Sequence, residues 1–278
     1  VAFLDLTKNP KVSQLLNLSV ITSLHTVMEI LSDESLVNFQ PLAFEALLSI
    51  LKYFPPTDET IEEEVLQKVI HICRNSMTSM MHNISTLLYI FGDKIGPLMP
   101  YLMDSIFENW GKISTTLILR TINMVSLSVP KFFEPYLSKI AVLITTSLSL
   151  QPSSVVIEIM ATILTFGNLL NTVDYIIIPS FINWIETNAK NTEIANTFLY
   201  QFRTILINCE VTKFSTELIK TCIIIVKQNP SLKMNATKIL LVLLYQMRDT
   251  FFIFLPDLLQ LFELKNDEDF NKMVNSIN

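Results

Sequence analysis

The stretch LMPYL at residues 98–102 sets a proline among apolar residues and opens an apolar helical pattern. The same phrase returns around Pro135, Pro179 and Pro256, at successive intervals of 35, 44 and 77 residues. The last interval is about two periods long, as if one unit between had lost its proline. A period of about 40 residues built from two helices is typical of a HEAT-type α-solenoid. We expect each of these prolines to begin a helix, because a missing N–H costs nothing in the first turn.

Apolar residues recur at helical spacing on either side of these prolines. In the unit around Pro100, one stripe is predicted to continue to Trp110, and Gly111 is expected to end that helix. Ser114 or Thr115 should cap the next helix, which Pro130 ends. The predicted apolar stripes of two successive units are Leu98, Leu102 and Ile106; Ile118, Ile122, Val125 and Val129; Leu137, Ile140, Ile144 and Leu148; and Val156, Ile159, Met160 and Ile163.

The whole chain follows this plan. We predict an all-α, HEAT-type α-solenoid of about seven antiparallel helix pairs. Residues 1–278 should form a single continuous array without separate domains, with units that start near residues 18, 61, 97, 133, 176, 214 and 252. The chain begins with Val1 rather than Met, so we expect it to be an excerpt of a longer polypeptide.

Composition narrows the classes of function. Half of the residues are hydrophobic and only 17% are charged, which excludes a disordered chain. Only four glycines occur, and none forms a phosphate-cradling loop. The net charge of −6 argues against nucleic acid as a partner, because phosphate binding requires a basic excess. The longest uncharged stretch, residues 140–157, is interrupted at Gln151-Pro152, so we expect no transmembrane segment.

No catalytic, cofactor-binding or metal-binding residue is predicted, and no cofactor is expected. The three histidines, His25, His71 and His82, lie in predicted helices without a partner at metal-ligand spacing. His71 and Cys73 should point to different faces of one helix. The odd number of cysteines, completed by Cys209 and Cys222, predicts buried thiols in a reducing compartment. The partner-binding residues are left unassigned.

Several other residues have a structural and a functional interpretation. Asp174 and Asp249 lie at loop-to-helix joints, where capping is a better explanation than acid catalysis. Trp110 and Trp184 each close the first helix of a unit, and we favour core positions over interface positions for both. Residues 60–63 look like a capping box at a helix start, and the adjacent acidic run is expected to be solvated.

The stretch Lys94-Ile95-Gly96-Pro97-Leu98-Met99 is followed by Trp110 in the same unit. This stretch and its separation from Trp110 resemble the middle HEAT segment of target of rapamycin (TOR) kinases. Gly96 stands where the family usually has arginine, and Pro135 is displaced from the family's proline. Further matches occur in the family's order across about residues 18–275, at Ile30 to Leu36, Phe132 to Leu137, Phe166 to Leu170, Asp174-Tyr175, Leu240 to Gln246 and Phe252 to Pro256.

This resemblance implies a non-catalytic scaffold inside a very large Ser/Thr protein kinase. In that family the segment bridges the N-terminal solenoid to the FAT and kinase regions, and it supports dimerisation and the docking of a Raptor-type subunit. The expected partners are therefore proteins, namely a second TOR chain and a Raptor-type subunit. The resemblance implies a cytoplasmic location, with peripheral association to vacuolar or other endomembranes. The segment carries none of the kinase motifs, so it should not be an enzyme by itself.

Other readings of a HEAT-type array stay open. A karyopherin-like nuclear transport receptor would bind cargo and a small GTPase, and it would continue as further repeats to its end. A vesicle-coat or phosphatase scaffold is a third reading, but the phosphatase scaffold should have more regular repeats with recurring Asp and Arg in the turns. Here the intervals vary from 35 to 44 residues. An enzyme is the fourth reading.

Overall fold

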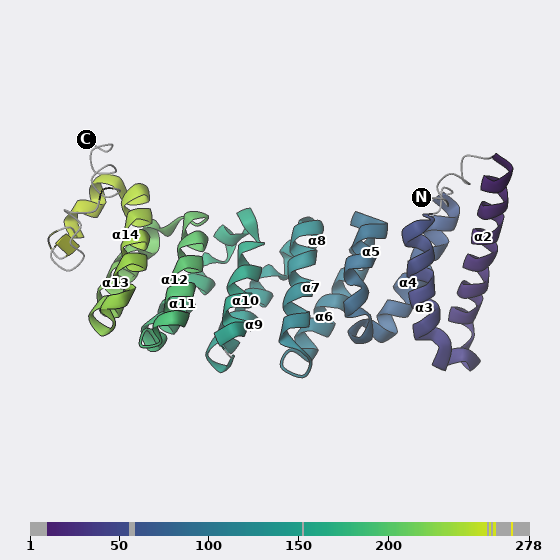
Figure 1. Ribbon diagram of the computed structural model, residues 1–278, viewed down its shortest axis with the longest axis horizontal. Coiled ribbons are helices and arrows are strands. Elements are labelled where there is room, and N and C mark those ends of the chain that lie inside the picture. The colour runs from purple at the N-terminus through teal and green to yellow at the C-terminus, as the bar shows by residue number, and fades with distance from the viewer. Residues whose placement is uncertain are drawn as a thin grey trace. The chain divides into compact units, whose positions relative to one another are not determined.

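The computed structural model describes residues 10–55, 59–151 and 153–254, together with Pro256, Leu258, Leu259 and Glu268. Within these residues the chain is entirely helical, and no strand occurs. The helices divide into two compact units, Val1–Ile113 and Ser114–Asn278. Figure 1 shows the helices of each unit packed side by side, and the two units are described separately below. The predicted all-α class is confirmed for the described part of the chain.

In its described residues the first unit contains five α-helices, and 3₁₀ segments join α2 to α3, α4 to α5 and α5 to α6. Helix α2 contacts α3 and α4, α3 also contacts α5, and α4 also contacts α6. Two layers result, one containing α2, α4 and α6 and the other containing α3 and α5. The elements are α2 (Pro10–Ser32), η1 (Glu34–Phe39), α3 (Gln40–Tyr53), α4 (Glu59–Met80), η2 (Met81–Asn83), α5 (Ile84–Phe91), η3 (Gly92–Leu98) and α6 (Met99–Asn109).

In its described residues the second unit has seven longer helices and the short helix α8. Turns of 3₁₀ helix make most of the connections between the longer helices, except between α11 and α12. The elements are α7 (Thr115–Ser128), α8 (Pro130–Phe133), η4 (Glu134–Tyr136), α9 (Leu137–Ser147), η5 (Leu148–Leu150), α10 (Ser153–Leu164), η6 (Gly167–Thr172), α11 (Asp174–Asn188), α12 (Thr192–Ile207), η7 (Val211–Phe214), α13 (Ser215–Gln228), η8 (Pro230–Leu232), α14 (Lys233–Met247) and η9 (Arg248–Phe254).

The second unit stacks its helices in two layers. In one layer α7 contacts α10, α10 contacts α12, and α12 contacts α14. In the other layer α9 contacts α11, and α11 contacts α13. Figure 1 shows α7, α10, α12 and α14 side by side in chain order. If the short helix α8 is left out, each longer helix from α7 to α12 therefore packs on the second helix further along the chain, which is consistent with an α-solenoid.

The predicted apolar stripes form the core. Fifteen of the sixteen stripe residues named from the sequence are buried, each with at most 2% of its surface exposed, and Trp110 at the end of the first stripe is half-buried. The largest aromatic cluster joins α11 to α12, where Trp184 stacks on Phe198 with ring centroids 4.4 Å apart. Phe181 and Phe202 also contact Phe198, at 5.4 and 5.8 Å between centroids. Isolated helices of this length are marginal in water, so this burial between helices supplies most of their stability.

The prolines do not all begin helices, which corrects one expectation. Pro100 does lie in the first turn of α6. Pro135 lies in the 3₁₀ turn η4, before α9 begins at Leu137. Pro179 lies inside α11, which begins at Asp174. The apolar residues before Pro179 also join the helix. Because Pro179 has no N–H, the backbone carbonyl of Tyr175, a residue that is exposed, loses its helical hydrogen bond. Pro256 is helical, but its two neighbours lie outside the described residues.

Helix boundaries agree closely with the predicted ones, and the caps agree less well. Helices expected to start near 61, 97, 176 and 214 begin at Glu59, Met99, Asp174 and Ser215. The helix expected near residue 18 is α2, which begins at Pro10. Thr60 lies inside α4 rather than at its N-cap, so the predicted capping box is wrong. Ser114 is the N-cap of α7 but forms no capping hydrogen bond through its side chain. The unit expected near residue 252 lies mostly outside the described residues.

Hydrogen bonds between neighbouring helices in the second unit repeat at one interval. Most of these bonds join helices of the same layer, or the turns that precede them, and their partners are 35 to 42 residues apart. The series includes Thr116 to Glu158, Ser126 with Thr165, the Glu210 N–H to Asn171, Thr221 to Glu186, Asn229 to the Ala189 carbonyl, and Asn235 to Asn196. The period of about 40 residues read from the prolines is therefore also the spacing of these contacts.

Candidate functional site

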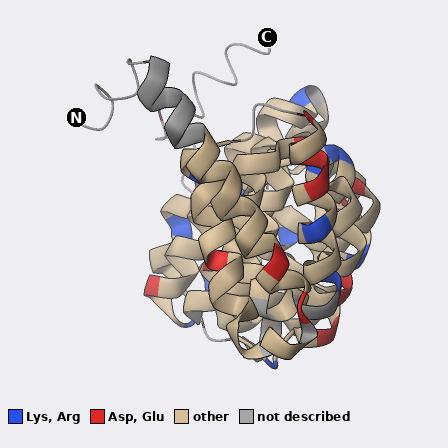
Figure 2. Ribbon diagram, turned by 90° about the vertical axis from the view of Figure 1, so that its right-hand side faces the viewer, with Lys and Arg blue, Asp and Glu red and all other residues tan. Residues whose placement is uncertain are grey.

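Charge is divided unequally between the two units. Residues 1–113 contain seven Lys or Arg and thirteen Asp or Glu, a balance of −6, whereas residues 114–278 contain thirteen of each. Figure 2 shows charged residues scattered along ribbons that carry mostly other residue types. The acidic excess of the whole chain thus resides in the first unit.

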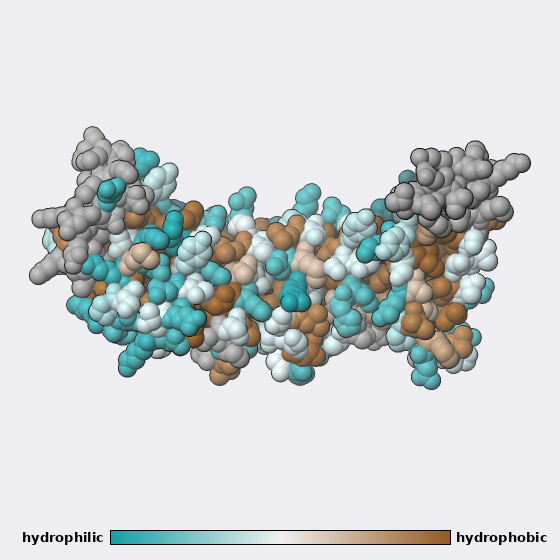
Figure 3. Space-filling view, viewed as in Figure 1, coloured by the Kyte–Doolittle hydropathy of each residue, from teal (hydrophilic) through white to brown (hydrophobic). Residues whose placement is uncertain are grey.

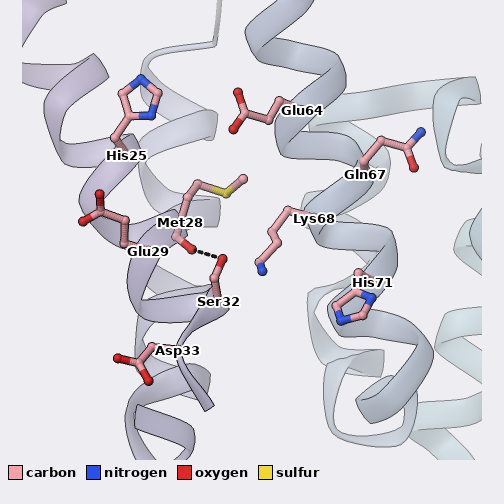
Figure 4. Close-up of a pocket in the computed structure, with 9 residues that line it drawn as sticks. All are labelled: His25, Met28, Glu29, Ser32, Asp33, Glu64, Gln67, Lys68 and His71. Atoms are coloured by element: carbon pink, nitrogen blue, oxygen red, sulfur yellow. Dashed lines mark hydrogen bonds between the residues drawn. The ribbon is translucent and has the colours of Figure 1, made fainter. Parts of the chain in front are cut away.

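A groove lies in the described part of the first unit. It has a volume of about 720 Å³ and lies between α2, with the turn that follows it, and α4. Figure 4 shows His25, Glu29 and Asp33 on the α2 side, facing Glu64, Lys68 and His71 on the α4 side. His25 and His71 are 46 positions apart in the sequence, and no pattern in the sequence predicted that they would line one groove.

The groove presents polar groups without a catalytic arrangement. Its hydrogen bond in Figure 4 runs from the Ser32 hydroxyl to the carbonyl oxygen of Met28, one turn back. The hydroxyl and the backbone N–H of Ser35 both donate to Asp33 Oδ1, and they hold the pKa of this carboxyl below its usual value. Among the described residues no bond joins a nucleophile to a base here. The groove can offer polar contacts to a partner molecule.

The histidines and the cysteines differ in their exposure to solvent. His25, His71 and His82 are exposed, whereas Cys73, Cys209 and Cys222 are buried and free. The predicted separation of His71 and Cys73 onto different faces of one helix is confirmed, because Cys73 is fully buried. Within the described ranges, no three side chains of His, Cys, Asp or Glu gather closely enough to hold a metal ion.

We expect the three thiols to be protected in the folded protein. Burial raises their pKa to about 12 for Cys73, about 11 for Cys209 and about 12 for Cys222. Because these values lie above the unfolded value of 9.0, their contribution to stability is complete below pH 9.0 and is lost as the pH rises towards 11–12. An Ellman titration at pH 8 should detect these thiols only after unfolding. Rapid reaction of all three in the native protein would contradict their burial.

Asp174 is held in an ion pair rather than serving as a simple cap. It is the first residue of α11, and its side chain is completely buried. The Lys213 ammonium donates to Asp174 Oδ1 at 2.9 Å and lies 2.7 Å from Oδ2. No capping hydrogen bond forms at this helix start, so the expected capping role is wrong for Asp174. The side chain of Asp249 lies outside the described residues.

The two tryptophans occupy different environments. Trp184 is 6% exposed and packs in the aromatic core, as predicted. Trp110 follows α6 and is only half-buried, and its indole nitrogen has no hydrogen-bond partner among the described residues. The core prediction therefore holds for Trp184 and only in part for Trp110.

Exposed apolar side chains are dispersed. Figure 3 shows brown, apolar surface in separate patches among hydrophilic side chains. Several large apolar or aromatic residues are more than half exposed, including Tyr53, Tyr89, Leu127, Tyr200 and Tyr245. In the described ranges, no helix combines the length and the apolar character that a membrane span requires.

Comparison with known proteins adds no identification. Neither protein-family models nor curated protein sequences give a match to this chain. The fold, the α2–α4 groove and the exposed surfaces therefore carry the functional argument.

Proposed function

We propose that this chain is a non-catalytic scaffold segment of a TOR-type kinase. In this proposal it is a HEAT-type array that bridges an N-terminal solenoid to FAT and kinase regions. It contributes to dimerisation and to the docking of a Raptor-type subunit. Its partners are proteins, and the catalytic activity belongs to a different region of the parent polypeptide.

The observation that supports a scaffold most strongly is the repeating set of contacts in the second unit. Hydrogen bonds recur between residues 35 to 42 positions apart, and helices stack in two layers. Such arrays use extended helix surfaces to hold partners. The assignment to TOR, as opposed to another array, rests on the sequence resemblance that includes residues 94–110.

A karyopherin-like transport receptor or another HEAT-repeat scaffold is the alternative function. The same stacking supports it, because the two classes share their architecture. A phosphatase-type scaffold fits less well. Between the described repeats of the second unit, Asp174 and Lys213 form an ion pair, whereas the hydrogen bonds at this interval mostly join amides, hydroxyls and backbone groups, with a carboxylate as the acceptor at Glu186.

The test of this proposal is the full polypeptide that the gene encodes and the complex that this polypeptide forms. A tag at the genomic locus would allow the intact polypeptide to be purified and sequenced by mass spectrometry. We expect FAT and kinase regions in the same polypeptide, and a second copy and a Raptor-type subunit in the complex. Further helical repeats up to the end of the polypeptide, together with a bound small GTPase, would replace this proposal with the transport receptor.

A further inference from the structure

Two facing stripes of side chains border the seam between α12 and α14. On α12, Tyr200, Arg203 and Ile207 follow Asn196 at helical spacing. On α14, Lys238, Val242 and Tyr245 follow Asn235 in the same way. We call these six residues, Tyr200, Arg203, Ile207, Lys238, Val242 and Tyr245, the α12–α14 seam.

Two hydrogen bonds fix the register of the two stripes. Asn235 Nδ2 donates to Asn196 Oδ1 at 2.7 Å near the start of the seam. Gln246 Nε2 donates to the carbonyl of Leu206 at 3.3 Å near its end. Because Asn196 and Asn235 each begin one of the stripes, the stripes lie beside each other along the seam. Figure 1 shows the two helices as neighbours.

The seam combines exposed apolar surface with positive charge. Tyr200, Ile207 and Tyr245 are 61%, 52% and 71% exposed. Arg203 and Lys238 are half-buried, and neither forms an ion pair with a described residue. Helix α14 contains no acidic residue, and the single one on α12, Glu193, lies in its first turn. Tyrosine and arginine are the residue types that dominate binding energy at protein interfaces.

We propose that the α12–α14 seam docks an acidic amphipathic segment of a partner protein. Acidic side chains of that segment pair with Arg203 and Lys238, and its apolar side chains cover Tyr200, Ile207 and Tyr245. Charge complementarity selects an acidic partner, because the seam presents two cations and no anion. A nucleic acid fits less well, since two cations neutralise few phosphates and the whole chain carries a net charge of −6.

This inference rests on the proposed scaffold function, because both assign the chain to protein binding. The two can fail independently. The scaffold assignment is tested by the full polypeptide encoded at the locus and by its subunits, whereas the docking proposal for the seam is tested by binding to the 278-residue chain alone.

The experiment selects binders from a random phage-displayed library of peptides about 16 residues long, enough for roughly four helical turns. The immobilised bait is the 278-residue chain. We expect the enriched peptides to combine Asp or Glu with large apolar residues. Fluorescence anisotropy should then show affinity falling about tenfold or more in the double variant R203E/K238E, because like charges now face each other. The variant Y200A/Y245A should also bind more weakly.

The matched control is K220E/K227E, which makes the same change of charge on exposed positions of α13 in the other layer. It should bind the selected peptides as the unchanged chain does, and circular dichroism should show that all variants are folded. The proposal is overturned if no peptide is enriched, if the enriched peptides are neutral or basic, or if R203E/K238E binds them equally well. It is also overturned if an oligouridine RNA binds at the seam and competes with the peptides.

Discussion

Replacing Phe198 by alanine should lower the free energy of unfolding by about 3–5 kcal/mol, the range for removal of a fully buried aromatic side chain. Phe198 is completely buried and lies at the centre of the α11–α12 cluster, where it contacts Trp184, Phe181 and Phe202. The substitution removes the stacked partner of Trp184 and leaves a cavity between two helices. Urea denaturation followed by tryptophan fluorescence measures the loss.

Tyr200 provides the control for this prediction on the same helix. Its side chain is 61% exposed, so Tyr200→Ala should change stability by no more than about 0.5 kcal/mol. An equal loss in the two variants would show that the assigned face of α12 is wrong. A Phe198→Ala protein with an unchanged urea midpoint would place that ring outside the core.

Lys213→Met should be the second most costly change, because it leaves the carboxylate of Asp174 buried without its cation. Breaking a buried pair costs about 3–5 kcal/mol, and we expect about 2–3 here since solvent screens the half-exposed lysine. The Lys213 side chain is 48% exposed and that of Asp174 is 0% exposed. The measurement is the urea midpoint at neutral pH.

A double variant distinguishes the free energy lost by breaking the Asp174–Lys213 ion pair from the free energy lost by removing packing contacts. Asp174→Leu combined with Lys213→Met replaces both charges by apolar groups, which is often neutral in buried pairs. We expect it to recover most of the stability that Lys213→Met alone loses. If the double variant is less stable than the single one, the cost does not come from a stranded carboxylate.

Local periodicity was enough to predict most of the helices and their buried faces. The stripe from Leu98 to Ile106 could be read because a helix returns to the same face every three or four residues. Gly111 was also predictable as a stop, since it adopts φ 76°, a conformation that glycine tolerates best. The start of the unit near residue 176 was predicted closely, but the expectation that Pro179 lies at the beginning of the helix was wrong, because proline type alone does not show how far the preceding apolar run extends a helix.

The contacts between repeats could not be read from local patterns. Lys213 reaches Asp174 across 39 positions, and Asn235 reaches Asn196 across the same separation. Neither pair is marked by residue type or by spacing within one helix. The α2–α4 groove was missed for the same reason. The α12–α14 seam has a weak sequence signature. Helix α14 contains no acidic residue, and its Tyr245 is exposed.

The most direct test of the repeating architecture is a crosslink across one repeat. Cysteines at Asn196 and Asn235, whose side chains are 2.7 Å apart, should be joined rapidly by a short bismaleimide. The control pairs Asn196→Cys with Tyr245→Cys, about 15 Å further along α14 at 1.5 Å per residue. We predict efficient crosslinking of the first pair only, located by mass spectrometry of the peptides. Equal crosslinking of both pairs, or none in the first, would contradict the stacking of repeats on which the scaffold proposal depends.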